Sequence, residues 1–127
     1  MRPWQHVHDC LNGYLTLVDA LLDGSGLGRL NFGPGRDSFV EVGQVATLAA
    51  ELWGGGAHWE LDDEKHPHEA NLLALDASKA QRELGWRNRL GFRDALAWTI
   101  DWERRVQAGG DPLTVTQEQI GAFESLK

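Results

Sequence analysis

Several residue types are scarce in this sequence of 127 residues, and each scarcity excludes a class of protein. The single cysteine, Cys10, excludes an internal disulfide and suits a reducing compartment, so we expect a cytoplasmic protein. No apolar run is long enough to span a membrane, and no signal-peptide pattern is present, so we expect no membrane partner. Basic residues number 12 against 19 acidic ones, and the net charge of −7 argues against a nucleic-acid partner.

What the sequence does contain is typical of one globular domain over residues 1–127. Hydrophobic residues make up 42% of the chain and charged residues 24%, which excludes a disordered composition. A domain of this size buries about two-thirds of the surface of its unfolded chain, which is enough for a core. The predicted strand RPWQHV starts directly after Met1, with no leader or tail before it. We therefore expect an internal piece of a larger protein that carries an added start methionine.

Hydrophobic periodicity predicts five helices. Apolar residues recur at spacings of three and four, and the glycines at 54–56 and 85 mark the ends of two helices. Ser38 to Glu41 and Thr116 to Gln119 each match a capping box, a pattern typical of a helix N-terminus. The predicted helices cover residues 7–22, a segment whose apolar face spans 42–53, Asp76 or Ser78 to Leu84, 92–107, and the segment after Thr116.

Four short apolar segments are predicted as strands: RPWQHV at the start, 29–33, 57–61 and 71–75. Because a helix separates 29–33 from 57–61, we expect these two to pair in parallel with a right-handed crossover. The predicted fold class is therefore α/β: a small helix-rich domain with short strands, one parallel βαβ unit and no Rossmann domain.

Three patterns that carry chemistry elsewhere fail here on context or spacing. GSGLG at 24–28 follows a predicted helix, whereas a dinucleotide-binding turn needs a strand before it and a helix after it, so we predict a loop. A tyrosine–lysine pair four residues apart is absent, because Val18 stands four residues after Tyr14, the single tyrosine. His66 and His68 flank a proline, so their rings point to different sides and we predict no metal site.

Four stretches of the chain resemble one known family. They are RPWQHV (2–7), LNFGPG (30–35), the long stretch 52–86, and TQEQIGAF (116–123). In order and spacing they are similar to the CDP-glucose 4,6-dehydratases, which belong to the extended short-chain dehydrogenases/reductases that act on nucleotide sugars. The most specific parts are RPWQHV and the pattern HPHEA…LD.SKA…LGW inside the long stretch.

The resemblance implies a two-lobed enzyme of which this chain matches only the C-terminal lobe, the one that binds the nucleotide sugar. In the family a larger Rossmann lobe holds NAD and the catalytic threonine, acid, tyrosine and lysine. We therefore expect no cofactor on this chain, NAD on a lobe that is absent here, and no catalytic residue within 1–127. The chain would bind a CDP-glucose-like nucleotide sugar as part of a lyase, and whether it acts as an enzyme stays open.

The resemblance also implies six substrate-binding residues and no metal ligand. Arg2 would lie against the diphosphate, because a guanidinium fork matches phosphate oxygens in a bidentate way. Glu69 would accept a hydrogen bond from the cytosine amino group, which uracil lacks. Relatives often carry an arginine just after the histidine–acid pair, whereas Asn71 stands here as a weaker, neutral donor. The full set is Arg2, Asn31, His66, His68, Glu69 and Asn71.

Two other functions stay open at this point. The first is a non-catalytic interaction module or remnant, whose 7–22 helix face would dock on a separate Rossmann-lobe chain or form a homodimer. The second and weaker one is a metal-binding domain built on His58, His66 and His68. Saturable CDP-glucose binding distinguishes the nucleotide-sugar lobe from the first alternative, and zinc-dependent stability would favour the second.

Overall fold

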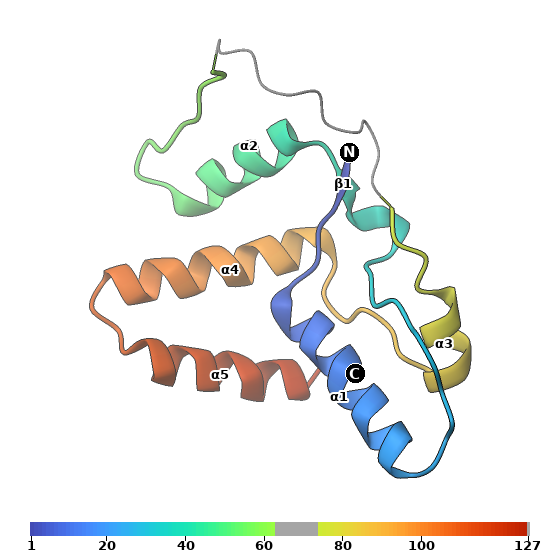
Figure 1. Cartoon of the computed structure of the whole chain (residues 1–127). Coiled ribbons are helices and arrows are strands. Elements are labelled where there is room, and N and C mark those ends of the chain that lie inside the picture. Colours follow the sequence, from blue (N-terminus) through green and yellow to red (C-terminus); the bar gives the residue numbers. More distant parts are fainter. Residues whose placement is uncertain (63–73, 127) are drawn as a thin grey trace.

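A computed structural model describes residues 1–62 and 74–126, which are mostly helical (Figure 1). In chain order the elements are β1 (Arg2–Pro3), α1 (Val7–Leu22), a 3-10 turn η1 (Arg36–Ser38), β2 (Phe39–Val40), α2 (Val42–Trp53), α3 (Ser78–Leu84), α4 (Phe92–Gln107) and α5 (Pro112–Glu124). Within these described ranges, no helix is both long and apolar enough to cross a membrane.

Four of the predicted helices agree with the structure. The bounds of α1 and α4 are as the periodicity predicts, and α2 ends at Trp53, before Gly54 with a φ of 74°. The short helix α3 ends at Leu84, and Gly85 adopts the left-handed conformation with a φ of 65°. The prediction of a helix-rich domain is therefore confirmed for these segments.

The predicted parallel βαβ unit is wrong for the residues the structure describes. Neither 29–33 nor 57–61 is a strand, and the sheet consists of β1 and β2, which pair antiparallel with Arg2 opposite Val40. Residues 57–61 follow three glycines with positive φ and are exposed, whereas parallel strands need both faces covered. Segment 29–33 lies instead against residues 75–79, where the Lys79 ammonium donates to the carbonyl of Arg29 at 3.3 Å.

Both predicted capping boxes are also wrong, because stronger caps begin the two helices elsewhere. Ser38 is 1% exposed, and its carbonyl accepts from the backbone N–H of Trp4 at 3.0 Å. Helix α2 begins after Glu41, which forms a reciprocal box with Gln44. Helix α5 begins at Pro112, and the Asp111 carboxylate accepts from the backbone N–H of Thr114 at 2.8 Å.

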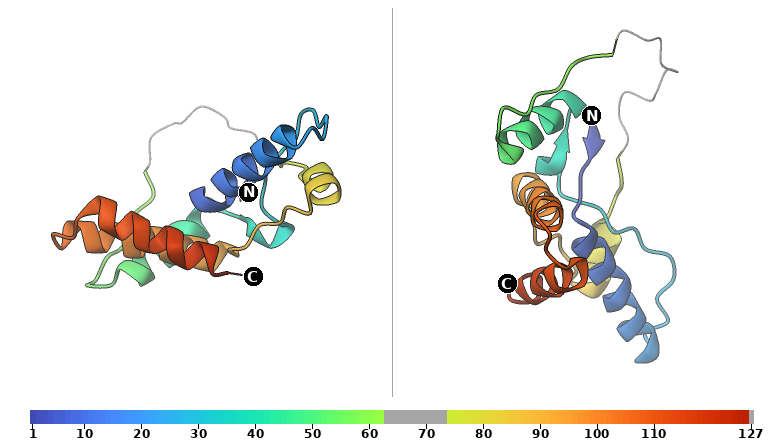
Figure 2. Two further views of the ribbon diagram at one scale, coloured as in Figure 1. Left: turned by 90° about the horizontal axis from the view of Figure 1, so that it is seen from below. Right: turned by 90° about the vertical axis from the view of Figure 1, so that its left-hand side faces the viewer.

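The helices pack in two groups. α4 lies between α2 and α5, and it runs antiparallel to α5 (Figures 1 and 2). α1 and α3 form the other group, and each group has its own apolar cluster. The buried members are Phe32, Ala77, Ala80 and Trp86 beside α1 and α3, and Leu90, Ala95 and Phe123 between α4 and α5.

A close approach at Gly13 lets α1 pack on the first cluster. A Cβ atom at this position would lie 2.4 Å from Cδ1 of Phe32, closer than any van der Waals contact allows. Phe32 in turn stacks edge-to-face on Trp86, with 5.1 Å between the ring centroids. Because Gly13 has no side chain, the Phe32 ring can pack directly against α1, and this contact fixes the LNFGPG segment.

We expect Gly13→Ala to lower the free energy of unfolding by about 1–3 kcal/mol, because the added methyl group overpacks the site. Gly121→Ala in α5 is the matched control, since a Cβ there meets no atom within 4 Å. That change should raise the free energy of unfolding by about 0.5–1 kcal/mol through helix propensity. Urea unfolding measures both, and a Gly13→Ala protein as stable as the wild type would contradict the proposed packing.

Candidate functional site

Arg2, the predicted diphosphate ligand, lies in a paired strand. It is half-buried in β1, and the antiparallel pairing with Val40 fixes its backbone. Two hydrogen bonds from Trp4 extend this attachment: its backbone N–H donates to the carbonyl of Ser38 at 3.0 Å, and its indole N–H donates to the carbonyl of Val40 at 3.3 Å. The backbone of Arg2 is therefore held in a strand that the fold positions.

Asn31 lies beside the residues that precede α3. Its amide nitrogen donates to the carbonyl of Asp76 at 3.3 Å. The Asp76 carboxylate accepts from the backbone N–H of Ser78 at 2.9 Å, and this bond, with one from the Ser78 hydroxyl, lowers the pKa of Asp76. The other four predicted site residues, His66, His68, Glu69 and Asn71, lie outside the described residues. Asn31 therefore lies next to Asp76, which follows these four residues in the sequence.

A polar crevice of about 220 Å³ lies between the 33–37 segment, α3 and the 87–91 loop. No motif in the sequence points to its polar residues, although RNR at 87–89, directly after the buried Trp86, is a recognisable signal of an exposed polar loop. Asn88 links the crevice to the first segment of the chain, because its side-chain oxygen accepts from the Gln5 amide at 2.9 Å. The lining residues are Gly33, Gly35, Asp37, Gln81, Arg87, Asn88, Leu90 and Gly91.

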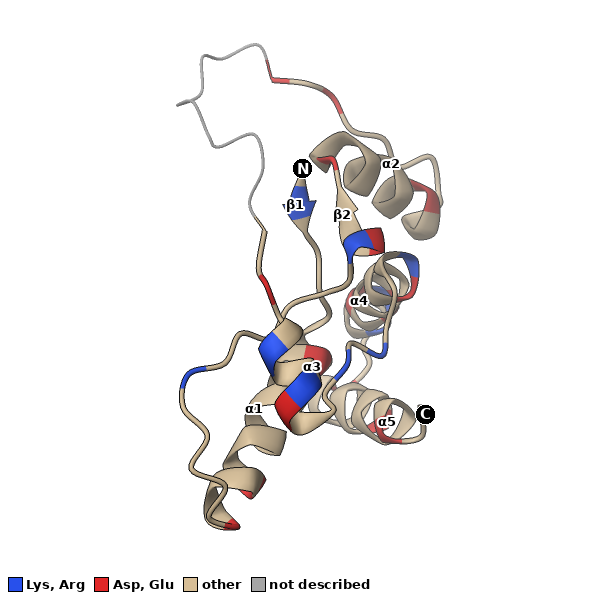
Figure 3. Cartoon of the chain, turned by 90° about the vertical axis from the view of Figure 1, so that its right-hand side faces the viewer, with Lys and Arg blue, Asp and Glu red and all other residues tan. Residues whose placement is uncertain are grey.

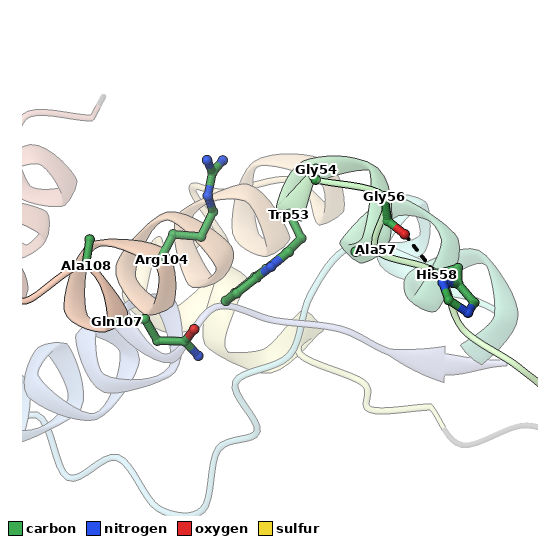
Figure 4. Close-up of a pocket in the computed structure, with 9 residues that line it drawn as sticks. Trp53, Gly54, Gly56, Ala57, His58, Arg104, Gln107 and Ala108 are labelled. Carbon is green, nitrogen blue, oxygen red and sulfur yellow. Dashed lines mark hydrogen bonds between the residues drawn. The ribbon is translucent and has the colours of Figure 1, made fainter.

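A wider hollow of about 750 Å³ lies between the end of α2 and the end of α4, and its polar groups do not converge (Figure 4). The Arg104 guanidinium and the His58 ring lie at opposite ends and point away from one another. Arg104 donates to the carbonyl of Leu52 at 3.2 Å, and Nδ1 of His58 is 3.4 Å from the carbonyl oxygen of Gly56. This hollow therefore lacks the convergent polar groups of a specific site. No three potential metal ligands come together anywhere in residues 1–62 and 74–126.

A buried cluster of ionisable side chains joins the first segment of the chain to the crevice. The Asp9 carboxylate is fully buried and accepts from the backbone N–H groups of Arg89 at 2.7 Å and Leu90 at 3.1 Å. His6 caps α1, and its Nδ1 accepts from the backbone N–H of His8 at 3.2 Å. Because these side chains form hydrogen bonds with backbone groups, they hold the start of α1, and with it β1, next to the 87–91 loop.

Burial sets the ionisation of this cluster. Desolvation, reinforced by the neighbouring His8, lowers the pKa of His6 to about 4. Desolvation also lowers the pKa of His8, against the effect of Asp9. The pKa of Asp9 is raised by desolvation, despite the opposing hydrogen bonds from Arg89 and Leu90. Both histidines are therefore neutral in the folded chain at neutral pH.

We expect acid to destabilise the fold through His6. A histidine with a folded pKa near 4 contributes stability that is fully present above its unfolded pKa of 6.5 and is lost as the pH falls towards 4. Between pH 7 and pH 5 this loss amounts to about 2 kcal/mol. His6→Asn keeps a capping oxygen and cannot titrate, so the variant should lack that part of the pH dependence.

Urea unfolding of both proteins at a series of pH values measures the difference. Asp9, whose raised pKa acts in the opposite sense, is present in both proteins and cancels. His8 is also common to both. Parallel stability curves for the wild type and His6→Asn would contradict the assignment of the loss to His6.

Comparison of the sequence with known proteins assigns the chain to a family. No model of a known protein family matches the chain. It is 37% identical over 98% of its length to the CDP-glucose 4,6-dehydratase of Salmonella typhimurium, and 32% identical over 89% to the dTDP-glucose 4,6-dehydratase of Streptomyces antibioticus. It is also 29% identical over 86% to the UDP-glucose 4-epimerase of Bifidobacterium longum.

The chain spans about a third of the length of these relatives, 35%, 32% and 31%, and it matches their C-terminal parts. The family expected from RPWQHV and the HPHEA pattern is thereby confirmed. By sequence, the chain belongs to the nucleotide-sugar dehydratases and epimerases, of which it corresponds to a C-terminal part.

Proposed function

We propose that this chain is the nucleotide-sugar-binding part of an NAD-dependent sugar 4,6-dehydratase, with CDP-glucose as the substrate. The observation that carries the proposal is the 37% identity to a CDP-glucose 4,6-dehydratase over 98% of the chain. The identities to the dTDP-glucose dehydratase and the UDP-glucose epimerase are lower, at 32% and 29%. The higher identity to the CDP-glucose enzyme favours cytosine over thymine or uracil as the base.

Arg2 is the proposed ligand of the diphosphate. Its guanidinium can donate two parallel N–H bonds to phosphate oxygens, and this geometry is not available to lysine. The pairing of β1 with β2 holds the backbone of Arg2 before a ligand arrives, which lowers the entropy cost of binding. A positioned arginine can bind an anion despite the net charge of −7, because pairwise contacts in one site outweigh distant charges.

His66, His68, Glu69 and Asn71 are the proposed contacts to phosphate, ribose and base. Glu69 would accept from the cytosine amino group, a hydrogen bond that uracil cannot donate. Asn71 would donate to a phosphate oxygen without adding charge. Asn31 is a further proposed contact, and its hydrogen bond to Asp76 holds Asp76, five residues after Asn71 in the sequence, next to LNFGPG.

The chain itself offers no fit for NAD at its glycine-rich segment. Residues 24–28 follow α1 and lead into irregular chain, whereas a dinucleotide turn needs a helix N-terminus directed at the pyrophosphate. We therefore assign no redox step to this segment and propose that NAD binds elsewhere in the enzyme. The proposed dehydration requires NAD and the reacting groups to be supplied by another lobe.

Titration with CDP-glucose tests the proposed function. We expect saturable binding by calorimetry, and a loss of about tenfold or more in affinity for Arg2→Ala, because one charge-assisted contact is worth about 1.4 kcal/mol or more. Arg2→Lys should also bind more weakly, because the fork is lost. Arg82→Ala on the exposed face of α3 is the control and should bind like the wild type. An absence of saturable binding at millimolar CDP-glucose would overturn the proposal.

Base selection is tested by comparing CDP with UDP. The wild type should prefer CDP, and Glu69→Gln should reduce that preference, because an amide oxygen is a weaker acceptor than a carboxylate. Competition between the two nucleotides, followed by NMR, gives the ratio directly. Equal affinities of the wild type for CDP and UDP would remove Glu69 from the site without affecting the role of Arg2.

A second candidate function is a non-catalytic module that self-associates. The observation that favours it is the exposure of large apolar side chains along α1, among them Leu15 at 64% and Leu22 at 80%. A stable dimer in solution together with no CDP-glucose binding would support this candidate. Sedimentation velocity and the titration above therefore separate the two functions.

A further inference from the structure

The strand that carries Arg2 is too short to be held in place by its own pairing. β1 has two residues, and its antiparallel pairing with β2 comprises two residue pairs, one of which joins Arg2 to Val40. Figure 3 shows the two strands side by side, with the basic residue of β1 in blue. Because a two-stranded sheet is marginally stable in water by itself, the position of Arg2 depends on further contacts.

Trp4 attaches this strand to the residues around β2 in two ways. Its backbone N–H donates to the carbonyl of Ser38 at 3.0 Å, which continues the pairing by one residue. Its indole N–H donates to the carbonyl of Val40 at 3.3 Å, in a partly buried position where the bond is stronger than it would be in water. Because Val40 is the residue opposite Arg2, the indole supports the pairing at the position of the proposed diphosphate ligand.

Gln5 attaches the same segment to a different part of the chain, the 87–91 loop. Its side-chain amide donates to the side-chain oxygen of Asn88 at 2.9 Å. The Asn88 amide in turn donates to the carbonyl of Leu90, a residue that is 4% exposed. Two side chains that are adjacent in the sequence thus hold the first segment to both the 38–40 segment and the 87–91 loop.

Pro3 makes the link between these attachments and Arg2 stiff. Its ring fixes its own φ at about −65°, and it confines the residue before it, Arg2, to an extended conformation. Few backbone rotations therefore remain free between Trp4 and Arg2. A displacement of the backbone at Trp4 is passed on to Arg2 because the peptide between them cannot absorb it.

We infer that Trp4 and Gln5 are positioning residues for Arg2, and that they act on the diphosphate of the nucleotide sugar only through it. A guanidinium whose backbone is fixed before the ligand arrives loses less conformational freedom on binding, so the affinity is higher. A merely structural role would lower the stability of the chain without a selective effect on ligand affinity. The inference rests on the proposed function, in which Arg2 is the diphosphate ligand.

Trp4→Phe tests the inference, because it keeps an aromatic ring and removes the indole N–H. We expect the affinity for CDP-glucose, measured by calorimetry, to fall by about threefold to tenfold, which corresponds to one hydrogen bond. Trp102→Phe is the matched control, since its indole is also partly buried and donates to the Thr116 hydroxyl at 2.9 Å. Both variants should unfold at lower urea concentrations than the wild type, and only Trp4→Phe should bind more weakly. Equal affinities of Trp4→Phe and Trp102→Phe would overturn the inference.

A double-mutant cycle shows whether Trp4 acts through Arg2. In an Arg2→Ala background, Trp4→Phe should cause no further loss of affinity, whereas additive losses would contradict the positioning role. Gln5→Leu removes the amide and keeps a side chain of similar size, so it should repeat both results, and it replaces Trp4→Phe should that variant fail to fold. Absence of binding by the wild type removes the proposed function and this inference together, whereas a loss of affinity confined to Arg2→Ala removes this inference alone.

Discussion

The arrangement of the chain depends on the two backbone hydrogen bonds that Asp9 accepts from Arg89 and Leu90. They join the start of α1 to the loop before α4 across a sequence separation of 80 residues. Because the carboxylate is fully buried, its loss would leave backbone donors without a partner, at a cost of about 1–3 kcal/mol each. Three residues separate the strand that carries Arg2 from α1, so this contact also positions the proposed phosphate ligand.

The packing brings together several segments that are distant in sequence. β1 pairs with β2, the first segment is linked to Asn88, and LNFGPG lies against the residues before α3 through Asn31. The first and the last of these contacts fix backbone at Arg2 and at LNFGPG, which the family resemblance associates with the nucleotide sugar. The exposed face of α1 is apolar and almost free of charge, and its Tyr14 ring packs edge-to-face on Phe32 of LNFGPG, with 5.7 Å between the ring centroids.

Helices were predictable from the sequence, because apolar residues recur with a period of 3.6 residues, even along α1, where these side chains are exposed. Strands were not. RLNFG and AHWEL have apolar composition, but Phe32 packs on Gly13 and Trp86, and Trp59 remains 44% exposed, so composition did not indicate pairing. The residue types at 38–41 match a capping box, but Ser38 is buried beside Trp4, whose backbone N–H donates to its carbonyl. A contact between such distant segments cannot be recognised from a local pattern. Of the predicted site, Arg2 and Asn31 could be located, and the crevice residues Arg87 and Asn88 were missed because each is polar without a motif.

We propose that the first strand and the segment around Asn31 bind a nucleotide sugar. Amide chemical shifts of the labelled chain, followed during addition of CDP-glucose, measure this binding residue by residue. We expect saturable shifts at Arg2, Asn31 and Asp76, with the amides of α5 unchanged. Shifts confined to the hollow around Trp53 and Arg104, or none at saturating ligand, would contradict it.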